Sequence, residues 1–330
     1  EMLRSLVGSE MCIRDRKRAS SSPVLAMQAT GSMASSTDSG TGWSQRPTGI
    51  STPRRCAVIG HPIAHSLSPL LHSTAYRELG IADQFRYAAI DVTPSELDDF
   101  IATLGPEWVG LSVTAPHKEA ILKFGQPTES AAELRAANTL IFGRDGATNQ
   151  LFNTDVTGFV NALVSVDVTA INSAIIVGAG ATARSCLAAL RQLGVAEVVV
   201  LARDEQRALT SLQPICDRAG VKLRWQSIAD VAVLPNVDVL VSTVPTNLVP
   251  ATATQLAAAA DTVFEAVYNF YPSNLDLAAQ AIGKTHLDGM HLLVFQAIEQ
   301  LRLMTDNDPL AVPLLAVGHR ELRLRQGAES

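Results

Sequence analysis

The chain has 330 residues, of which 47% are hydrophobic and 18% charged, and its formal net charge at pH 7 is −6. This length predicts two domains of about 100–200 residues each, and the hydrophobic content excludes a chain that is disordered throughout. The mild acidity argues against nucleic acid as the main partner, because phosphate binding needs a concentrated basic surface. No apolar run reaches the ~18 residues of a membrane span, so no membrane partner is expected.

Residues 1–53 differ in composition from the rest, being rich in Ser, Thr and Gly, with basic side chains at Arg14, Arg16, Lys17 and Arg18. Basic, Ser-rich N-termini are typical of organelle-targeting peptides, but several acidic residues dilute that pattern here. We therefore expect a disordered leader or a non-native segment. With this segment set aside, the expected location of the protein is the cytoplasm.

The cysteines and histidines predict no special chemistry. The four cysteines are widely spaced and contain no CxxC pair, which favours reduced, structural thiols of the kind found in cytosolic proteins. The seven histidines form no HExxH pattern and no Cys/His cluster, so no metal site is expected.

Alternating strands and helices begin at Cys56. Strands are predicted at 56–60, 85–90, 109–113 and 138–142, and helices at 69–79, 94–104 and 131–137. Gly80 is expected to stop the first helix. Thr93, with Glu96 three residues on, is expected to cap the second. The alternation predicts an α/β domain with a largely parallel sheet.

A second α/β unit begins at Ser173. Strands are predicted at 174–177, 197–201, 237–242 and 262–268, and helices at 181–193 and 292–303. Gly194 is expected to close the helix that follows the first of these strands. The predicted fold class is therefore two α/β domains, the second one Rossmann-like.

A glycine-rich turn connects the first strand and helix of this second unit. Its sequence matches G-x-G-x-x-A and consists of Gly178, Ala179, Gly180, Ala181, Thr182 and Ala183. Gly178 permits the tight turn, Gly180 lets the backbone approach a pyrophosphate, and Ala183 lets the helix pack close to the strand. The helix N-terminus also offers N–H groups to phosphates. In this strand–turn–helix context we expect a dinucleotide site rather than a small-residue packing loop.

The end of the next strand decides the cofactor. A carboxylate there would bind the ribose 2′-hydroxyl of NAD, whereas an arginine would pair with the 2′-phosphate of NADP. Arg203 comes first and Asp204 directly after it. The planar guanidinium suits a phosphate, so NADP is the predicted cofactor and NAD the alternative.

Four further polar clusters follow predicted strands or precede them. They read HPIAHSLSP at 61–69, SVTAPHK at 112–118, AANT at 136–139 and NTDVTG at 153–158. Strand ends in α/β sheets face the ligand crevice, which favours a binding role for these side chains. In the first cluster Ser66 and Ser68 form a compact pair of hydroxyl donors suited to a carboxylate, although either serine could instead cap a helix.

The order HSxSP, VTxPxK, ANT, NTDxxG and GAGxxA resembles that of the shikimate dehydrogenase family, and the resemblance runs from Arg54 to Gly318. It implies reversible, NADPH-dependent reduction of 3-dehydroshikimate to shikimate, in the pathway to chorismate and the aromatic amino acids. It also implies an N-terminal substrate-binding domain, residues 54–158 with C-terminal helices at about 290–320, and a dinucleotide-binding domain at 159–289.

The resemblance also implies roles for single residues. Lys118 and Asp155 would form the catalytic pair. Substrate would be bound by Ser66, Ser68, Thr114, Asn138, Tyr268 and Gln296. Thr243 and Val244 belong to the stretch that would run beside the nicotinamide.

Some positions depart from the family pattern. Glu265 stands where the family usually has Asp, Phe270 where it has Pro, Ser112 where Asn is common and Leu292 where Met is common. An NAD-dependent quinate/shikimate dehydrogenase therefore stays open as an alternative. A non-catalytic, shikimate- or nucleotide-binding regulatory homologue is a second alternative, although a sensor would need neither Lys118 nor Asp155. Monomer and homodimer are both compatible with the sequence.

Overall fold

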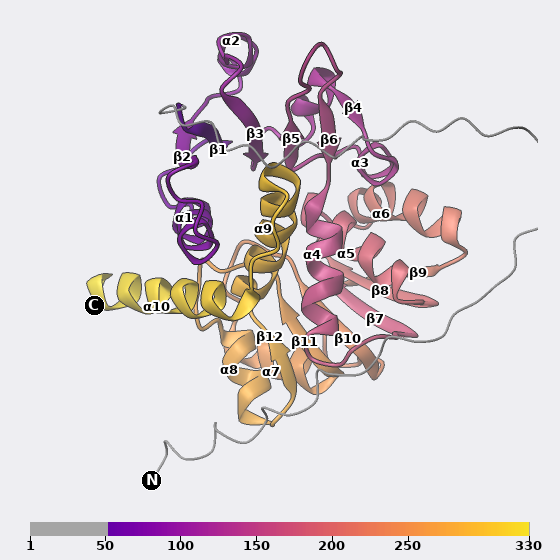
Figure 1. Cartoon of the computed structure of the whole chain (residues 1–330). Coiled ribbons are helices and arrows are strands. Elements are labelled where there is room, and N and C mark those ends of the chain that lie inside the picture. The colour runs from indigo at the N-terminus through magenta and orange to yellow at the C-terminus, as the bar shows by residue number, and fades with distance from the viewer. Residues whose placement is uncertain (1–51, 330) are drawn as a thin grey trace, which may run out of the picture. The chain divides into compact units, whose positions relative to one another are not determined.

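Two six-stranded sheets with accompanying helices make up residues 52–329, the part of the chain that the computed structural model describes (Figure 1). Both sheets are mainly parallel, which confirms the predicted α/β class. The predicted leader, residues 1–53, falls almost wholly outside the described residues.

The first sheet has the strand order β2-β1-β3-β5-β6-β4. Its strands are β1 (Arg54–Gly60), β2 (Phe85–Asp91), β3 (Trp108–Val113), β4 (Gln126–Pro127), β5 (Thr139–Ile141) and β6 (Gln150–Phe152). All neighbours are parallel except β5, which runs antiparallel to β3 and to β6. Every residue of β3 is buried, as expected for a central strand covered on both faces.

Four short helices follow strands of this sheet: α1 (Ser68–Glu78), α2 (Leu97–Ala102), the 3-10 helix η1 (Ala120–Phe124) and α3 (Glu129–Leu134). α1 ends just before Gly80, whose φ of +67° confirms the predicted stop. The predicted cap of α2 is wrong. Thr93 donates its backbone N–H to the Glu96 carboxylate at 2.9 Å, and this closes a turn, so that the helix begins only after Glu96.

The second sheet is parallel throughout and has the order β12-β11-β10-β7-β8-β9. Its strands are β7 (Ser173–Val177), β8 (Glu197–Ala202), β9 (Lys222–Ser227), β10 (Val237–Ser242), β11 (Ala260–Glu265) and β12 (Thr285–Leu287). This is the strand order of the doubly wound dinucleotide-binding fold. The two strands missing from the sequence analysis, β9 and β12, form its edges and are short or polar, so they have no continuous apolar run.

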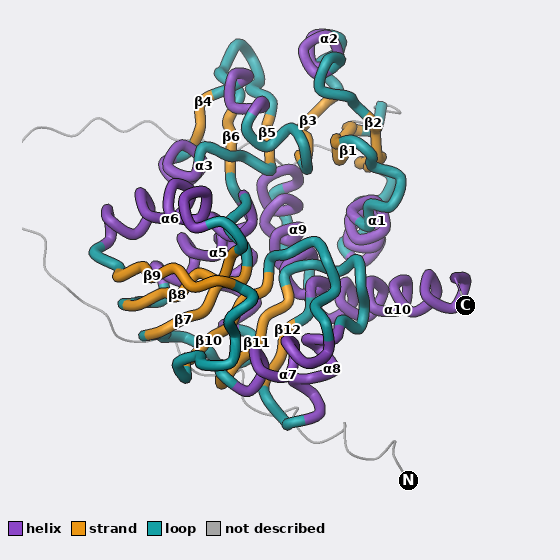
Figure 2. The backbone as a smooth tube through the Cα atoms, turned by 180° about the vertical axis from the view of Figure 1, so that it is seen from behind, coloured by secondary structure: helices purple, strands orange, loops and turns teal. Residues whose placement is uncertain are grey.

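Helices α4 (Thr154–Val164), α5 (Ala181–Gln192), α6 (Glu205–Ala219), α7 (Pro250–Ala258) and α8 (Asn274–Ala281) accompany this half of the chain. The α5 prediction is confirmed, and Gly194 has a φ of +92° just beyond it. α4, α6, α7 and α8 were not predicted. Figure 2 shows α7 and α8 beside β11 and β12, where they cover the second sheet.

The chain then returns to the first sheet through α9 (Gly289–Thr305) and α10 (Ala311–Glu329), with α9 packed on α4, α1 and α10 (Figure 1). The contact between α4 and α9 requires a glycine. A Cβ atom at Gly158 would lie 2.6 Å from the backbone nitrogen of Gln296. This close approach makes the start of α4, which carries Asp155, a neighbour of Gln296.

Cys56, Cys186 and Cys216 are free and buried, as predicted, and Cys12 lies outside the described residues. Between residues 52 and 329, no helix is long and apolar enough to cross a membrane.

Candidate active site

A cavity of about 310 Å³ lies where β1 and β3 end, and α9 contributes its opposite wall. All eight side chains predicted for catalysis or substrate binding line it: Ser66, Ser68, Thr114, Lys118, Asn138, Asp155, Tyr268 and Gln296. Thr182 of the glycine-rich turn lines the same cavity. The structure thus brings residues from seven separate segments to one place.

The reversed strand β5 explains why these segments meet. Thr139 at the start of β5 pairs with Ser112 near the end of β3 and with Phe152 at the end of β6. Asn138, which precedes its strand, therefore lies at the same edge as the residues that follow β3 and β6. The sequence pattern predicts 138–142 only as one more strand of a largely parallel sheet, so this reversal was not predicted.

Lys118 and Asp155 form an ion pair with 2.6 Å between Nζ and Oδ2. Lys118 lies in the turn after β3, and Asp155 lies in the first turn of α4. Their side chains are 21% and 11% exposed, so the pair is largely shielded from water yet faces the cavity. A partly desolvated ammonium group held in this way can stabilise negative charge on a bound molecule and supply a proton.

Asn138 is fixed from both ends of its amide. Its Oδ1 accepts from the backbone N–H of Thr154 at 2.8 Å and from the Thr154 hydroxyl at 3.1 Å. Its Nδ2 donates to Asp155 Oδ1 at 2.9 Å and to Gln296 Oε1 at 3.5 Å. Oδ1 also accepts from the Thr139 hydroxyl at 3.0 Å, so the amide orientation is fixed and its Nδ2 lies between two other residues that line the cavity.

Ser66 and Ser68 lie at the entrance to α1. The residue at the N-cap position is Leu67, with no side-chain capping bond, so the alternative prediction that one of the serines caps the helix is wrong. Ser66 Oγ instead accepts from the backbone N–H of Ser68 at 3.3 Å, and both serines line the cavity. Thr114 also lines the cavity, and its N–H donates to the carbonyl of Ile59 at 2.9 Å.

The remaining wall comes from α9 and the segment after β11. Gln296 Nε2 donates to the carbonyl of Leu293 at 2.8 Å, which fixes its amide beside Asn138. Tyr268 reaches the cavity from the loop that follows β11. Burial raises the pKa of Tyr268, so its phenol stays a neutral donor and acceptor at physiological pH.

Two further residues that line the cavity, Ser112 and Gln300, are hydrogen-bonded to each other and had no predicted role. The hydroxyl of Tyr87 bonds to Ser112 Oγ at 2.6 Å, and Ser112 Oγ donates to Gln300 Oε1 at 2.7 Å. Gln300 Nε2 in turn donates to the carbonyl of Asn138 at 3.4 Å. Ser112 was noted only as a departure from the family pattern. Gln300 could have been found, because it follows Gln296 by four residues and so lies on the same face of α9.

The glycine-rich turn has the geometry that a dinucleotide needs. Gly178 has a φ of +104°, and a Cβ atom there would lie 2.5 Å from Thr243 Oγ1. A Cβ at Gly180, the N-cap of α5, would meet nothing within 4 Å, so the helix N-terminus is open to a phosphate. Ala183 is fully buried between helix and sheet. The residues present therefore fit a bound dinucleotide.

The other predicted cofactor residues are distributed around this turn. A second cavity of about 820 Å³ is lined by Ala179, Gly180, Ala181 and Asp204. Thr243 and Val244 lie against Gly178 on the other side. Arg203 is exposed and lines neither cavity, whereas Arg207, which was not predicted, lines the second one. Asp204 caps α6, since its Oδ1 accepts the Arg207 N–H at 2.9 Å.

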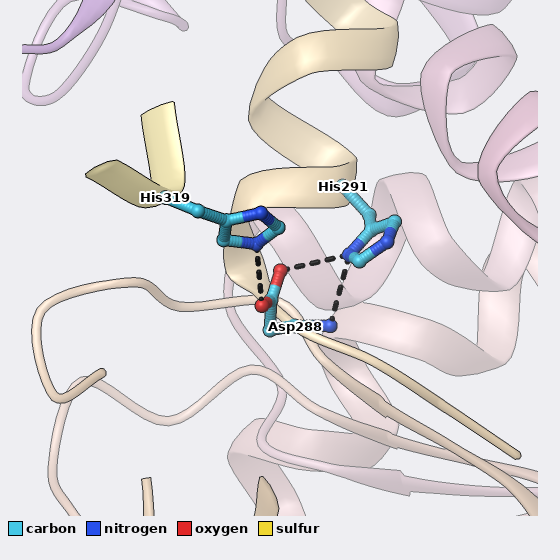
Figure 3. Close-up of side chains that lie close together, drawn as sticks. All are labelled: Asp288, His291 and His319. Atoms are coloured by element: carbon cyan, nitrogen blue, oxygen red, sulfur yellow. Dashed lines mark hydrogen bonds and ion pairs between the residues drawn. The ribbon is translucent and has the colours of Figure 1, made fainter. Parts of the chain in front are cut away.

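One compact group contains the residue types that metal sites use, namely Asp288, His291 and His319 (Figure 3). Its ring nitrogens lie 2.8 and 2.7 Å from the two carboxylate oxygens of Asp288. Asp288 also accepts the N–H of Met290 and so caps α9. Burial alone would raise the pKa of Asp288, but the bonds to both histidines outweigh it and hold that pKa below its ordinary value. We interpret the group as a capping network between α9 and α10.

Comparison with known proteins identifies a matching family and relatives of this chain. Residues 58–140 match the family described as shikimate dehydrogenase substrate binding domain. The chain is 34% identical over 272 residues to shikimate dehydrogenase (NADP(+)) of Afipia carboxidovorans, a match that covers 80% of this chain and 95% of the relative.

Solved structures agree. Shikimate 5-dehydrogenase of Mycobacterium fortuitum superposes with a TM-score of 0.72 at 36% identity, covering 81% of this chain and 98% of that one. Shikimate 5-dehydrogenase of Thermus thermophilus, in complex with NADP(H) and shikimate, has a TM-score of 0.70 at 27% identity, covering 81% and 99%. Sequence motifs, sheet order and these likenesses lead to one conclusion: the chain belongs to the shikimate dehydrogenase family.

Proposed function

We propose that this protein catalyses the reversible, NADPH-dependent reduction of the ketone of 3-dehydroshikimate to shikimate. The observation that carries the proposal is the largely buried ion pair between Lys118 and Asp155, 2.6 Å apart in a cavity lined by the other predicted substrate residues. Relatives named shikimate dehydrogenase (NADP(+)) and a Thermus thermophilus structure with NADP(H) and shikimate support it.

In this proposal the nicotinamide cofactor supplies the hydride, and the protein supplies position, charge and a proton. Negative charge then grows on the ketone oxygen of the substrate. The Lys118 ammonium group stabilises this charge and donates the proton, while Asp155 holds the ammonium in place. Asn138 and Gln296 bind substrate hydroxyls with amides that are already oriented.

The carboxylate of the substrate would bind to the hydroxyls of Ser66 and Ser68 at the entrance to α1. Thr114 and Tyr268, which line the same cavity, would complete the binding site. Residues 54–158, with the C-terminal helices at about 290–320, would form the substrate-binding domain, and residues 159–289 would form the cofactor-binding domain.

NADP is the cofactor that the residues favour. Asp204, the group that would bind a ribose 2′-hydroxyl, already uses one carboxylate oxygen as the cap of α6. Arg207, four residues after Arg203 and in the first turn of that helix, adds a second guanidinium group. Two guanidinium groups suit the doubly charged 2′-phosphate of NADP.

The test is turnover of shikimate by the purified protein, followed as reduced-cofactor absorbance with NADP⁺ and NAD⁺ in parallel and quinate as the second substrate. The expected result is rapid turnover of shikimate with NADP⁺ and not with NAD⁺. Preference for NAD⁺, or equal use of quinate, would move the protein to the quinate/shikimate alternative. Binding of shikimate without turnover of any pair would indicate a regulatory homologue. The cytoplasmic location and the choice between monomer and homodimer stay predictions.

A further inference from the structure

The C-terminal helix α10 contacts two walls of the cavity. Arg325 Nη1 donates to the backbone carbonyl of His65 at 2.8 Å, and His65 belongs to the serine loop, here defined as residues 65–68. His319 Nε2 lies 2.7 Å from Asp288 Oδ2, at the beginning of α9. The two contact residues are six positions apart, which is about 9 Å along a helix. One rigid element therefore spans the distance between the two walls.

Neighbouring groups brace the contact between His319 and Asp288 (Figure 3). Asp288 caps the helix whose next turns carry Gln296 into the cavity. Tyr271 stacks on the ring of His319, with 5.4 Å between the ring centroids. Gly318 allows α10 to lie directly on α9, since a Cβ there would come within 2.3 Å of the Met290 sulfur. Movement of α10 would thus be transmitted to the first turn of α9.

The contact at the serine loop is a single charged donor on a backbone acceptor. Glu321, one turn earlier on α10, accepts from Arg325 Nε at 3.0 Å and so orients the guanidinium. Leu67, in the middle of the serine loop, is buried in the same hydrophobic cluster as Leu322 of α10. The loop that carries Ser66 and Ser68 therefore has α10 as its support.

We propose that α10 clamps the substrate cavity, and that Arg325 and His319 are positioning residues that set the distance between the serine loop and α9. Neither side chain lines the cavity, so each would act on the substrate only through the wall it holds. The inference rests on the proposed function, because it takes the serine loop to be the carboxylate site. A clamp of this kind lowers the cost of binding by holding the hydroxyl donors in place before the substrate arrives.

The test uses the full chain and the variants Arg325→Ala, Arg325→Lys and Arg320→Ala. Arg320 is the matched control, since it is an exposed arginine on the same helix and does not line the cavity. For Arg325→Ala, the dissociation constant for shikimate, measured by calorimetry, is expected to rise about three- to tenfold. Affinity for NADP⁺ should be unchanged. Arg325→Lys should recover part of the loss, and Arg320→Ala should match the wild type.

A double-mutant cycle separates positioning from general stability. If Arg325 acts through the serine loop, Ser66→Ala and Arg325→Ala together should weaken shikimate binding by less than the product of their separate effects. Binding of the shikimate methyl ester, which lacks the carboxylate charge, should depend less on Arg325 than binding of shikimate does. His319→Gln, which retains a side-chain donor, should bind shikimate more tightly than His319→Ala.

Several results would overturn the clamp. They are equal behaviour of Arg325→Ala and Arg320→Ala, equal loss of shikimate and NADP⁺ affinity, or effects that multiply in the cycle. The proposed function is judged separately, from turnover by the wild type and by Arg320→Ala. Calorimetry needs no turnover, so the clamp proposal can be tested even if the protein binds shikimate without oxidising it. A protein that does not bind shikimate at all would overturn both proposals.

Discussion

The two ligand regions of this protein are built on different principles. The dinucleotide turn is one continuous stretch, from β7 through Gly178 and Gly180 into α5, and what it offers to a phosphate is backbone. The substrate cavity is lined by side chains from residue 58 to residue 300, and what they offer is hydroxyl, amide, ammonium and carboxylate groups. Backbone chemistry can be supplied by one local conformation, whereas side-chain chemistry in this cavity requires distant segments to meet.

The regions also differ in how their charges are used. Lys118 and Asp155 are shielded from water, so the interaction of each charge with a bound molecule is weakly screened. Arg203 and Arg207 are exposed, so the surrounding water and salt weaken their attraction to a phosphate. Loss of charge in the substrate cavity should therefore affect the chemical step, and loss of charge at the cofactor turn should affect binding.

The largest expected effect is on the substrate side. Lys118→Ala should lower kcat about 10²–10⁴-fold, the range typical for loss of general acid–base help, with a smaller effect on the KM for shikimate. Steady-state kinetics with NADP⁺ checks this. Lys123→Ala is the matched control, because Lys123 lies five residues further on, is exposed and does not line the cavity. A near-normal kcat for Lys118→Ala would remove Lys118 from the mechanism.

A smaller effect of a different kind is expected at the cofactor turn. The double variant Arg203→Ala, Arg207→Ala should raise the KM for NADP⁺ about 10- to 100-fold, because charge-assisted contacts to the 2′-phosphate are lost. The KM for NAD⁺, which lacks that phosphate, should stay within about twofold of the wild-type value. Arg144→Ala, an exposed arginine in the other half of the chain, is the control. A parallel rise for both cofactors would contradict the assignment.

The smallest effect concerns stability and pH. Burial, reinforced by nearby Asp276, raises the pKa of Glu265 to about 8 from an ordinary value of 4.5. Between these values the folded protein holds a proton that the unfolded chain has released, so the free energy of unfolding falls as the pH rises from about 5 to 8. Glu265→Gln removes the ionisable group, and with it this loss of stability. The substitution should raise the unfolding free energy at pH 8 by about 1–3 kcal/mol.

Chemical denaturation at pH 5 and pH 8 measures that change. At pH 5 the variant and the wild type should be equally stable, because Glu265 is then protonated in the folded state. Glu78→Gln, at an exposed position in α1, is the control. The change in unfolding free energy that it causes should be the same at pH 5 and at pH 8. A Glu265→Gln protein that is less stable than the wild type at pH 8 would show that the carboxylate is bound in its charged form.

Local patterns in the sequence predicted most of the central elements. The apolar runs of β1, β3, β7, β8 and β10 and the glycine stops after α1 and α5 were read with small errors at their ends. Polar or edge elements such as β9 and β12 were missed, since their stability comes from neighbouring strands and helices rather than from their own composition. The start of α2 was misplaced: Glu96 accepts from the Thr93 N–H, but the helix begins only at Leu97.

The sequence by itself determined which chemical groups are available: the glycine turn, the paired serines, Lys118, Asn138 and Asp155. Tertiary structure alone decided how they meet. The reversal of β5 brings Asn138 beside the ends of β3 and β6, and the close contact at Gly158 places Gln296 against Asp155. The place of Arg207 at the cofactor cavity and the support from α10 also emerged only in the fold. Strand direction and helix contact depend on burying surfaces from distant segments together, and no local pattern of residues encodes that.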